Sequence, residues 1–98
     1  MHVAVNFFLQ AELDLIEFVP LEEHVNVLEA IIERIGAYPE IGVRLEPPDD
    51  FARAHGVGRW VVYWEPFYTS IARDQVERVE VLRIVPDAFA TVPRLPGY

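Results

Sequence analysis

The chain has 98 residues, which is enough for one hydrophobic core but not for two. We therefore expect a single domain over residues 1–98, and the 52% share of hydrophobic residues is typical of a globular protein. The chain has no cysteine, which excludes disulfides and thiolate metal sites. No apolar run approaches the roughly 20 residues that span a bilayer, and the first residues lack the pattern of a secretory signal. We therefore expect a cytoplasmic protein.

The balance of charges is strongly acidic. The formal net charge is −8, and all eight basic residues are arginines. Proteins that bind duplex nucleic acid neutralise its phosphates with lysine and arginine, whereas the 16 acidic residues of this chain would repel a phosphate backbone. The composition therefore disfavours nucleic-acid binding.

The beginning of the chain predicts a short strand followed by a helix. Val3 and Val5 alternate with polar or small residues, as in a strand, and Asn6 is placed to cap the helix that follows. That helix is predicted over residues 8–18, and Pro20 separates it from the next one. Its apolar stripe consists of Leu9, Leu13 and Ile16, widened by Leu15 and Phe18.

A second helix has the most regular apolar pattern in the chain. Glu22 and Glu23 lie in its first turn and Arg34 in its last, where each charge stabilises the helix dipole. Gly36 fits a C-terminal cap, and Pro39 prevents the helix from continuing. The apolar stripe consists of Leu21, Val25, Leu28, Ile31, Ile32 and Ile35. We expect the two helices to face one sheet as an antiparallel pair.

Three strands are predicted in the second half of the chain. Val43 and Leu45 indicate a short strand that ends at Pro47, and two longer strands are predicted over residues 59–64 and 79–85. In the first of the longer strands one face is formed by Trp60, Val62 and Trp64. In the second, strict alternation groups Arg83 with Val79, Val81 and Val85. Neither strand has a polar face, so we expect both to be central or covered on both sides.

The remaining stretches carry no strand or helix pattern. Residues 49–58 are expected to form a loop, because they are polar and contain glycine. Residues 66–78 are longer than a tight hairpin turn, and Thr69 or Ser70 is placed to cap one helical turn there. Residues 86–98 contain three prolines and are expected to lie extended on the sheet.

Four short motifs follow one another along this predicted succession of elements. They are Ala11-Glu-Leu-Asp14-Leu15, Tyr38-Pro39-Glu-Ile-Gly42, Gly58-Arg-Trp-Val-Val-Tyr63 and Val81-Leu-Arg-Ile84. In this order and spacing, the chain resembles the RelE/ParE family of toxins from bacterial toxin–antitoxin systems over residues 3–85. The resemblance implies an α+β fold, in which an N-terminal strand and a helical hairpin pack on a small twisted antiparallel sheet.

The function that this resemblance implies is growth inhibition. Members of the family either cleave mRNA on the ribosome or poison DNA gyrase, and each is neutralised by a cognate antitoxin protein. We therefore expect a type II toxin that acts by gyrase-like target binding or by weak ribosome-dependent RNA cleavage, with no cofactor. The alternative is a non-catalytic interaction module on the same scaffold. Exposed strand edges also make a homodimer possible.

The chain departs from the family pattern at the residues that would cleave RNA. Family members are typically basic, whereas this chain is acidic and has no lysine. With Tyr63 in register, the family's strand arginine falls at Trp60, and Arg59 is displaced by one residue and hence to the other face. Pro86 and Asp87 follow the last strand, where family members often carry histidine or arginine. These departures leave the fold intact and argue against nuclease activity.

Among single residues, the candidates for a site are His55, Arg59, Tyr63 and Arg83. His55 is the best acid–base candidate, because an imidazole titrates near neutral pH; otherwise it is a surface residue. We interpret Arg59 as a solvated residue at the start of its strand. We interpret Tyr63 as a core residue, because a phenol is a poor base at neutral pH. Arg83 is either half of a structural ion pair or a contact for a partner, and Glu80 and Asp87 are the carboxylates considered for the pair.

Other constellations have simpler interpretations. His2, His24 and His55 show no metal-ligand spacing, so we expect no metal site. Asp49 and Asp50 read as a solvated turn, and Tyr98 reads as a disordered chain end. The two tryptophans are expected to be core residues instead of a stacking platform for bases, because no basic residues surround them.

Overall fold

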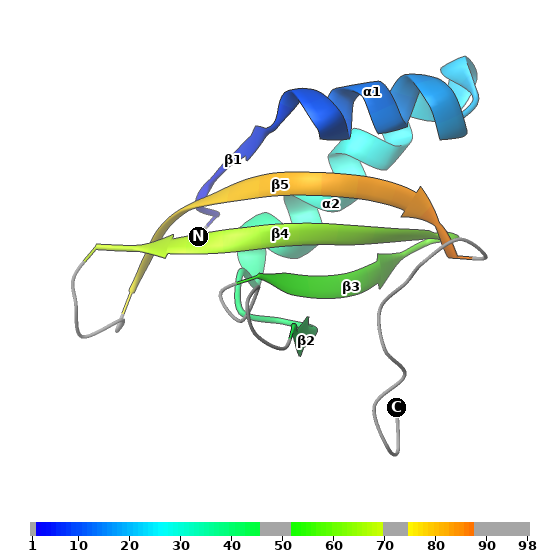
Figure 1. Ribbon diagram of the computed structural model, residues 1–98. Coiled ribbons are helices and arrows are strands. Elements are labelled where there is room, and N and C mark those ends of the chain that lie inside the picture. Colours follow the sequence, from blue (N-terminus) through cyan, green and yellow to red (C-terminus); the bar gives the residue numbers. More distant parts are fainter. Residues whose placement is uncertain (1, 46–51, 70–74, 88–98) are drawn as a thin grey trace.

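The computed structural model describes residues 2–45, 52–69 and 75–87, which form two helices and a five-stranded sheet. The elements in chain order are β1 (Ala4–Phe7), α1 (Leu9–Phe18), the 3₁₀ turn η1 (Leu21–Glu23), α2 (His24–Ala37), β2 (Val43–Arg44), β3 (Arg53–Val57), β4 (Trp60–Tyr68) and β5 (Val76–Pro86). In the sheet they are ordered β1-β5-β4-β3-β2 (Figure 1). The predicted α+β class, the initial strand, the two helices and the final strand pair are confirmed.

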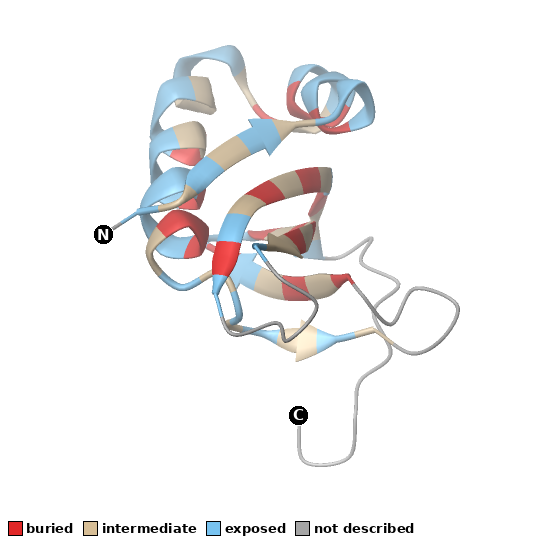
Figure 2. Ribbon diagram, turned by 90° about the vertical axis from the view of Figure 1, so that its left-hand side faces the viewer, coloured by how far each residue is buried: buried red, intermediate tan, exposed pale blue. Residues whose placement is uncertain are grey.

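The sheet is antiparallel except at one edge. β2, β3, β4 and β5 pair antiparallel with their neighbours, whereas β1 pairs parallel with β5, Ala4 lying opposite Arg78 and Phe7 opposite Val81. The parallel pairing is possible because the two helices and the rest of the sheet separate β1 from β5 in sequence. Figure 2 shows α1 end-on and α2 along its length, so the helices cross, and the expectation of an antiparallel pair is wrong.

The core lies between the sheet and the helices. Trp60, Val62 and Trp64 of β4 are buried on the face that carries the core, as their alternation predicts. The indole N–H of Trp64 donates to the carbonyl of Pro39 at 2.8 Å, so the largest buried side chain has no unsatisfied polar atom. The helices and β5 contribute Ala11, Leu15, Val27, Ile31, Ile35, Val79, Val81 and Ile84.

A β-bulge in β5 changes which residues face this core. Tyr63 pairs with Arg83, but the next residue, Trp64, pairs with Val81, so Leu82 is an extra residue in β5. After the bulge the alternation is reversed, and Ile84 continues the buried row of Val79 and Val81. The expectation that Arg83 shares the valine face is therefore wrong, because strict alternation does not hold across an inserted residue.

The predicted helix ends also differ from the structure. Asn6 lies in β1 opposite Glu80, and Phe8 occupies the N-cap position of α1 without a side-chain cap. Gly36 is not a C-terminal cap but a buried residue in the last turn of α2, which ends at Ala37. Its carbonyl accepts a hydrogen bond from Val3 N–H at 2.9 Å. An added Cβ would lie 3.4 Å from Val5 Cγ2, which is an ordinary van der Waals contact, so the position of β1 does not by itself require a glycine here.

The apolar stripe predicted for α1 is only partly its buried face, because Leu15 is buried and Phe18 packs against the core but the other three residues do not. Leu9, Leu13 and Ile16 are exposed, whereas Ala11, Asp14 and Leu15 are buried. Likewise, Leu21 and Val25 of the second predicted stripe are exposed, and Ile31 and Ile35 are buried. The helices cross, so each presents only a narrow face to the sheet. Apolar residues on a second face of each helix are exposed in the described structure.

Two stretches expected to be loops are strands. β3 occupies part of the predicted loop 49–58, and its pairing with β4 outweighs the weak strand propensity of its glycine and alanine residues. β4 and β5 extend through residues 66–68 and 76–78, and Thr69 N–H donates to Gln75 O where the hairpin closes. β2 confirms the short strand at Val43. Residues 49–51, Ser70, residues 71–74 and the tail from 88 to 98, including Tyr98, lie outside the described residues.

No described helix is long and apolar enough to cross a lipid bilayer.

Candidate functional site

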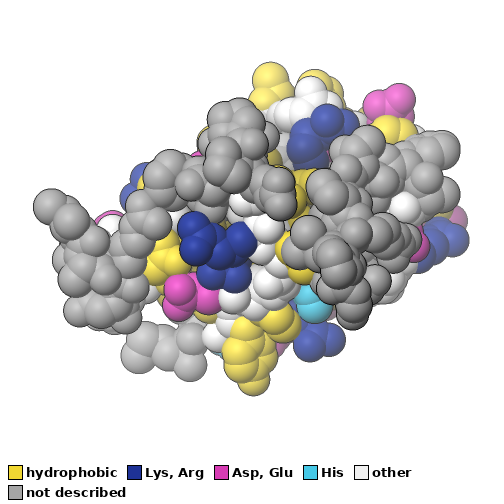
Figure 3. Space-filling model, turned by 60° about the horizontal axis from the view of Figure 1, so that its bottom comes forward, with side chains coloured by type: hydrophobic (Ala, Val, Ile, Leu, Met, Phe, Trp, Pro, Cys, Tyr) yellow, Lys and Arg dark blue, Asp and Glu magenta, His cyan; other side chains and the backbone are white. Residues whose placement is uncertain are grey.

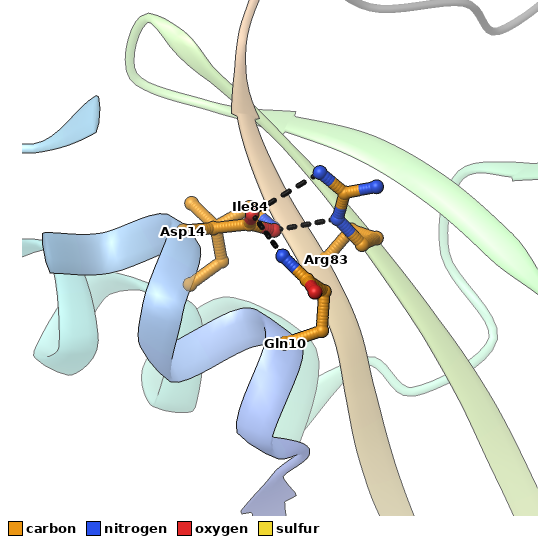
Figure 4. A network of polar contacts seen from close by, with 4 residues as sticks. All are labelled: Gln10, Asp14, Arg83 and Ile84. Atoms are coloured by element: carbon orange, nitrogen blue, oxygen red, sulfur yellow. Dashed lines mark hydrogen bonds and ion pairs between the residues drawn. The ribbon is translucent and has the colours of Figure 1, made fainter. Parts of the chain in front are cut away.

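A bidentate ion pair ties α1 to the bulged part of β5. Arg83 Nε donates to Asp14 Oδ2 at 2.7 Å, and its Nη2 donates to Oδ1 at 3.1 Å (Figure 4). The same carboxylate accepts the backbone N–H of Ile84 at 2.9 Å and the side-chain amide of Gln10 at 3.0 Å. Asp14 is completely buried, whereas the Arg83 side chain is 47% exposed.

This carboxylate takes the place of a neighbouring strand. β1 pairs with β5 only as far as Val81, after which Phe8 N–H donates to Val81 O and the chain turns into α1. Beyond that point the N–H of Ile84 has no strand partner on this side, and Asp14 supplies the acceptor. A buried backbone donor left unpaired would cost about 1–3 kcal/mol. The structural ion pair considered for Arg83 therefore exists, but its carboxylate is Asp14 and not Glu80 or Asp87.

The charge state of Asp14 follows from opposing effects. Burial raises the pKa of the carboxyl, but the hydrogen bonds from Arg83, Ile84 and Gln10 together hold the pKa below its usual value. The hydrogen bond to Asp14 in turn raises the pKa of Arg83. Both groups are therefore charged at neutral pH, as a bidentate Arg–carboxylate pair requires.

Tyr63 lies beside this pair on the face of the sheet that points away from the core. It pairs directly with Arg83, and it neighbours the buried Val62 and Trp64, so its side chain points to the opposite side. Its hydroxyl is buried and forms no hydrogen bond with the described residues. Tyr63 is therefore only partly buried and is not among the residues of the hydrophobic core, so the predicted core packing is wrong. The hydroxyl is a polar atom without a described partner next to a half-exposed arginine.

His55 and Arg59 do not join Tyr63 and Arg83. His55 lies in β3 opposite Val62, so it belongs to the helix-side face of the sheet. Arg59 lies in the turn between β3 and β4, where its Nη2 donates to Glu23 Oε2 at 2.9 Å and its guanidinium lies 5.1 Å from the Trp60 ring centroid. The structure brings together only Tyr63 and Arg83, and no three potential metal ligands gather among the described residues.

The position of His55 predicts a pH-dependent stability. Burial and, secondly, the charge of Arg34 lower the pKa of His55 below its usual value of about 6.5. The neutral form is therefore favoured in the folded state. Its contribution is complete above about pH 6.5 and is lost as the pH falls through the folded pKa. We expect His55→Gln to weaken the decline in stability between about pH 6.5 and 5, measured by urea unfolding; exposed His2→Gln is the control. Unchanged pH dependence in His55→Gln would contradict this assignment.

The described arginines are largely occupied by acceptors within the chain. Besides the pairs of Arg59 and Arg83, Arg78 contacts Glu77 and Glu80 and lies 4.3 Å from the Phe67 ring centroid. Arg53 Nη1 donates to the carbonyl of Glu40 at 2.7 Å. Figure 3 accordingly shows dark-blue side chains at separate places, one group of them directly beside magenta side chains, and no continuous basic surface among the described residues in that view.

The helical layer carries a second feature that the sequence interpretation missed. Between α1 and α2 lies an open pocket of about 170 Å³. It is lined by Phe7, Ala11, Glu12, Leu15, Leu28, Ile32 and Ile84. The signal was present in the sequence: apolar residues occur at more helical positions than one core-facing stripe requires. A helix with two apolar faces has one face for its own core and one for another contact.

Comparison with known proteins rests on structure. No family model matches the chain, and no curated protein matches it. Among solved structures, a chain of the toxin–antitoxin complex RelBE2 from Mycobacterium tuberculosis superposes with a TM-score of 0.68 at 17% identity. The match covers 88% of this chain and 99% of that chain. The protein therefore has a RelE-like fold, which confirms the fold expected from the sequence motifs.

Proposed function

We propose that the protein is the toxin of a bacterial type II toxin–antitoxin system and inhibits growth by binding a protein target. The observation that carries this proposal is the RelE-like fold shared along 88% of the chain with a chain of a toxin–antitoxin complex. The exposed apolar side chains of the helical layer support binding to other proteins, because large apolar patches mark protein-binding surfaces. The site of action is the cytoplasm, and the first partner is a cognate antitoxin.

The arginine contacts favour target binding over RNA cleavage. Cleavage requires cations directed at the charge that develops on the phosphate. Arg59, Arg78 and Arg83 instead bind carboxylates of this chain, which would have to be displaced by RNA. The net charge of −8 adds a long-range repulsion between the protein and a phosphate backbone. Gyrase-like binding of a protein target is therefore the mode that the charges support best.

One observation favours weak ribosome-dependent cleavage as the second candidate. The buried Tyr63 hydroxyl has no hydrogen-bond partner among the described residues, and it neighbours the half-exposed Arg83 across the strand pair. If RNA displaced Asp14 from Arg83 and reached the hydroxyl, the phenol would donate a proton to a leaving oxygen while the cation stabilised the phosphate. A non-toxic interaction module on this scaffold is the remaining alternative, and a homodimer stays a prediction from the strand edges.

Induction of the protein alone in a bacterial host is expected to arrest growth. Co-expression with the product of the neighbouring gene should relieve the arrest, because the antitoxin covers the target-binding surface. Colony counts after induction measure both effects, and Gly42→Ala, which we expect to destabilise the fold, tests whether the toxicity depends on the folded state. Harmless expression of abundant folded protein would support the interaction module instead.

A pair of variants separates the two modes of arrest. Tyr63→Phe removes only the hydroxyl, and we expect full arrest to persist if the protein acts by binding. Supercoiling by purified gyrase should then fall in the presence of the protein, while translation on purified ribosomes continues. If Tyr63→Phe abolishes arrest at unchanged stability and mRNA is cut only by the parent protein, cleavage is the mode and target binding is wrong.

A further inference from the structure

Exposed apolar side chains concentrate on the helical layer. Seven of the eight large hydrophobic residues exposed in the described structure lie at the start of α1, in α1, in η1 or in α2. They are Phe8, Leu9, Leu13, Ile16, Leu21, Val25 and Ile32. Leu9 and Ile16 are 70% and 71% exposed. Full burial of one such side chain is worth about 1.5–3 kcal/mol, so a partner that covers several of them gains substantially.

The pocket between α1 and α2 continues this apolar surface inwards. Six of its seven lining residues are apolar, and Leu15 and Ile84 link it to the core. On α2, Leu28 and Ile32 line the pocket, and Val25 lies on the same face, one helical turn before Leu28 and two before Ile32. The result is an apolar groove between two crossing helices, whose shape suits a row of side chains from a third helix.

The rim of this groove is acidic. Glu12 of α1 lines the pocket and is its only charged residue. Glu29 lies four residues after Val25 and three before Ile32, so it borders the same apolar face of α2. Exposed carboxylates in the helical layer are Glu12, Glu17, Glu22, Glu29 and Glu33, whereas the described helices contain one arginine, Arg34, and no lysine. The charge of Arg34 lowers the pKa of His55 in β3, so this arginine lies on the sheet side of α2 and not at the groove.

We infer that the groove binds a basic amphipathic helix of the neutralising partner. The inference rests on the proposed function only for the identity of that partner; the groove and its rim specify the chemistry. Apolar residues at three- and four-residue steps would enter the groove, and Lys or Arg beside them would meet Glu12 and Glu29. A second copy of this chain would bring two acidic rims together, which like-charge repulsion opposes.

Two synthetic helices of equal length test this inference. Both carry the same leucine stripe, and the flanking positions are Lys in one peptide and Glu in the other. We expect the Lys peptide to bind the full chain at least about tenfold more tightly by fluorescence anisotropy. Binding should weaken as salt rises from about 50 to 300 mM, because the rim charges are exposed. Glu12→Lys/Glu29→Lys should reverse the preference between the peptides, and Ile32→Asp should abolish binding of both.

The matched control is Glu77→Lys, which changes an exposed carboxylate of β5 outside the helical layer. Equal affinities for both peptides, an unchanged preference in the double variant, or an equal effect of Glu77→Lys would overturn the inference. The growth assay separates this outcome from the proposed function. If the neighbouring gene product still relieves arrest by the double variant, the toxin assignment stands and the basic-helix inference fails. If the parent causes no arrest but the peptides behave as expected, only the toxin assignment fails.

Discussion

Arg83→Met is expected to destabilise the fold by about 2–3 kcal/mol. The variant leaves the fully buried carboxylate of Asp14 without its bidentate cation, and an uncompensated buried charge typically costs about 3–5 kcal/mol. We expect less than that range because the Arg83 side chain is 47% exposed, so solvent already screens part of the interaction. Urea unfolding at neutral pH measures the effect.

The double variant Asp14→Asn/Arg83→Met tests the physical cause. An asparagine oxygen still accepts the N–H of Ile84, but it carries no charge that needs compensation. We therefore expect the double variant to be more stable than Arg83→Met alone, a non-additivity typical of directly interacting groups. If Arg83→Met and the double variant are each within about 0.5 kcal/mol of the parent, the pair is only a surface contact.

The ion pair of Asp14 and Arg83 also makes the stability of the fold depend on pH. Because the folded pKa of Asp14 is lower than its unfolded value of about 3.9, the carboxylate contributes stability that is complete above that pH. The contribution is lost as the pH falls through the folded pKa. The stability difference between the parent and Arg83→Met should therefore narrow as the pH is lowered below about 4.

Gly42→Ala is the second large expected effect. Gly42 has φ +86°, a left-handed conformation that favours glycine, and an added Cβ would overlap the carbonyl oxygen of Ala54 and lie 3.0 Å from His55 Cβ. Strain of the backbone and displacement of β3 together should cost about 2–4 kcal/mol. Because this turn follows the residues that accept hydrogen bonds from Trp64 and Arg53, the core and the sheet edge would both be loosened.

Gly58→Ala provides a matched control for that variant. Gly58 also has a positive φ, +62°, but an added Cβ would meet nothing within 4 Å. Only the conformational strain remains, which we expect to cost about 1 kcal/mol. Urea midpoints of the two variants separate strain from steric overlap. Equal losses in both would show that the contact with Ala54 does not matter.

Much of the fold could be predicted because its signals are local. The periodicity of α2, the alternation of Trp60, Val62 and Trp64, and the order of elements depend on residues close in sequence, and the structure confirms them. β3 could not be predicted in this way, because Arg53–Val57 has weak strand propensity and becomes a strand through its pairing with β4.

The candidate site was less predictable than the fold. The sequence leaves Arg83 either half of an ion pair or a contact for a partner, and the carboxylate that binds it lies 69 residues away in α1. Its position depends on the bulge at Leu82 and on the end of the β1 pairing, neither of which leaves a periodic signal in the sequence. His55 and Tyr63, considered together as candidates, lie on opposite faces of the sheet.

The sequence by itself determined the acidic charge, the two helices, the final strand pair and the tryptophan face of the core. These follow from composition and from contacts between near neighbours, which a single periodicity describes. Only the tertiary structure decided which apolar faces of the helices are buried and which carboxylate binds Arg83. It also left open an apolar groove with an acidic rim. Which face of a helix is buried depends on how the helix crosses its neighbours. When a helix has apolar residues on two faces, its sequence alone does not decide which of the two is buried.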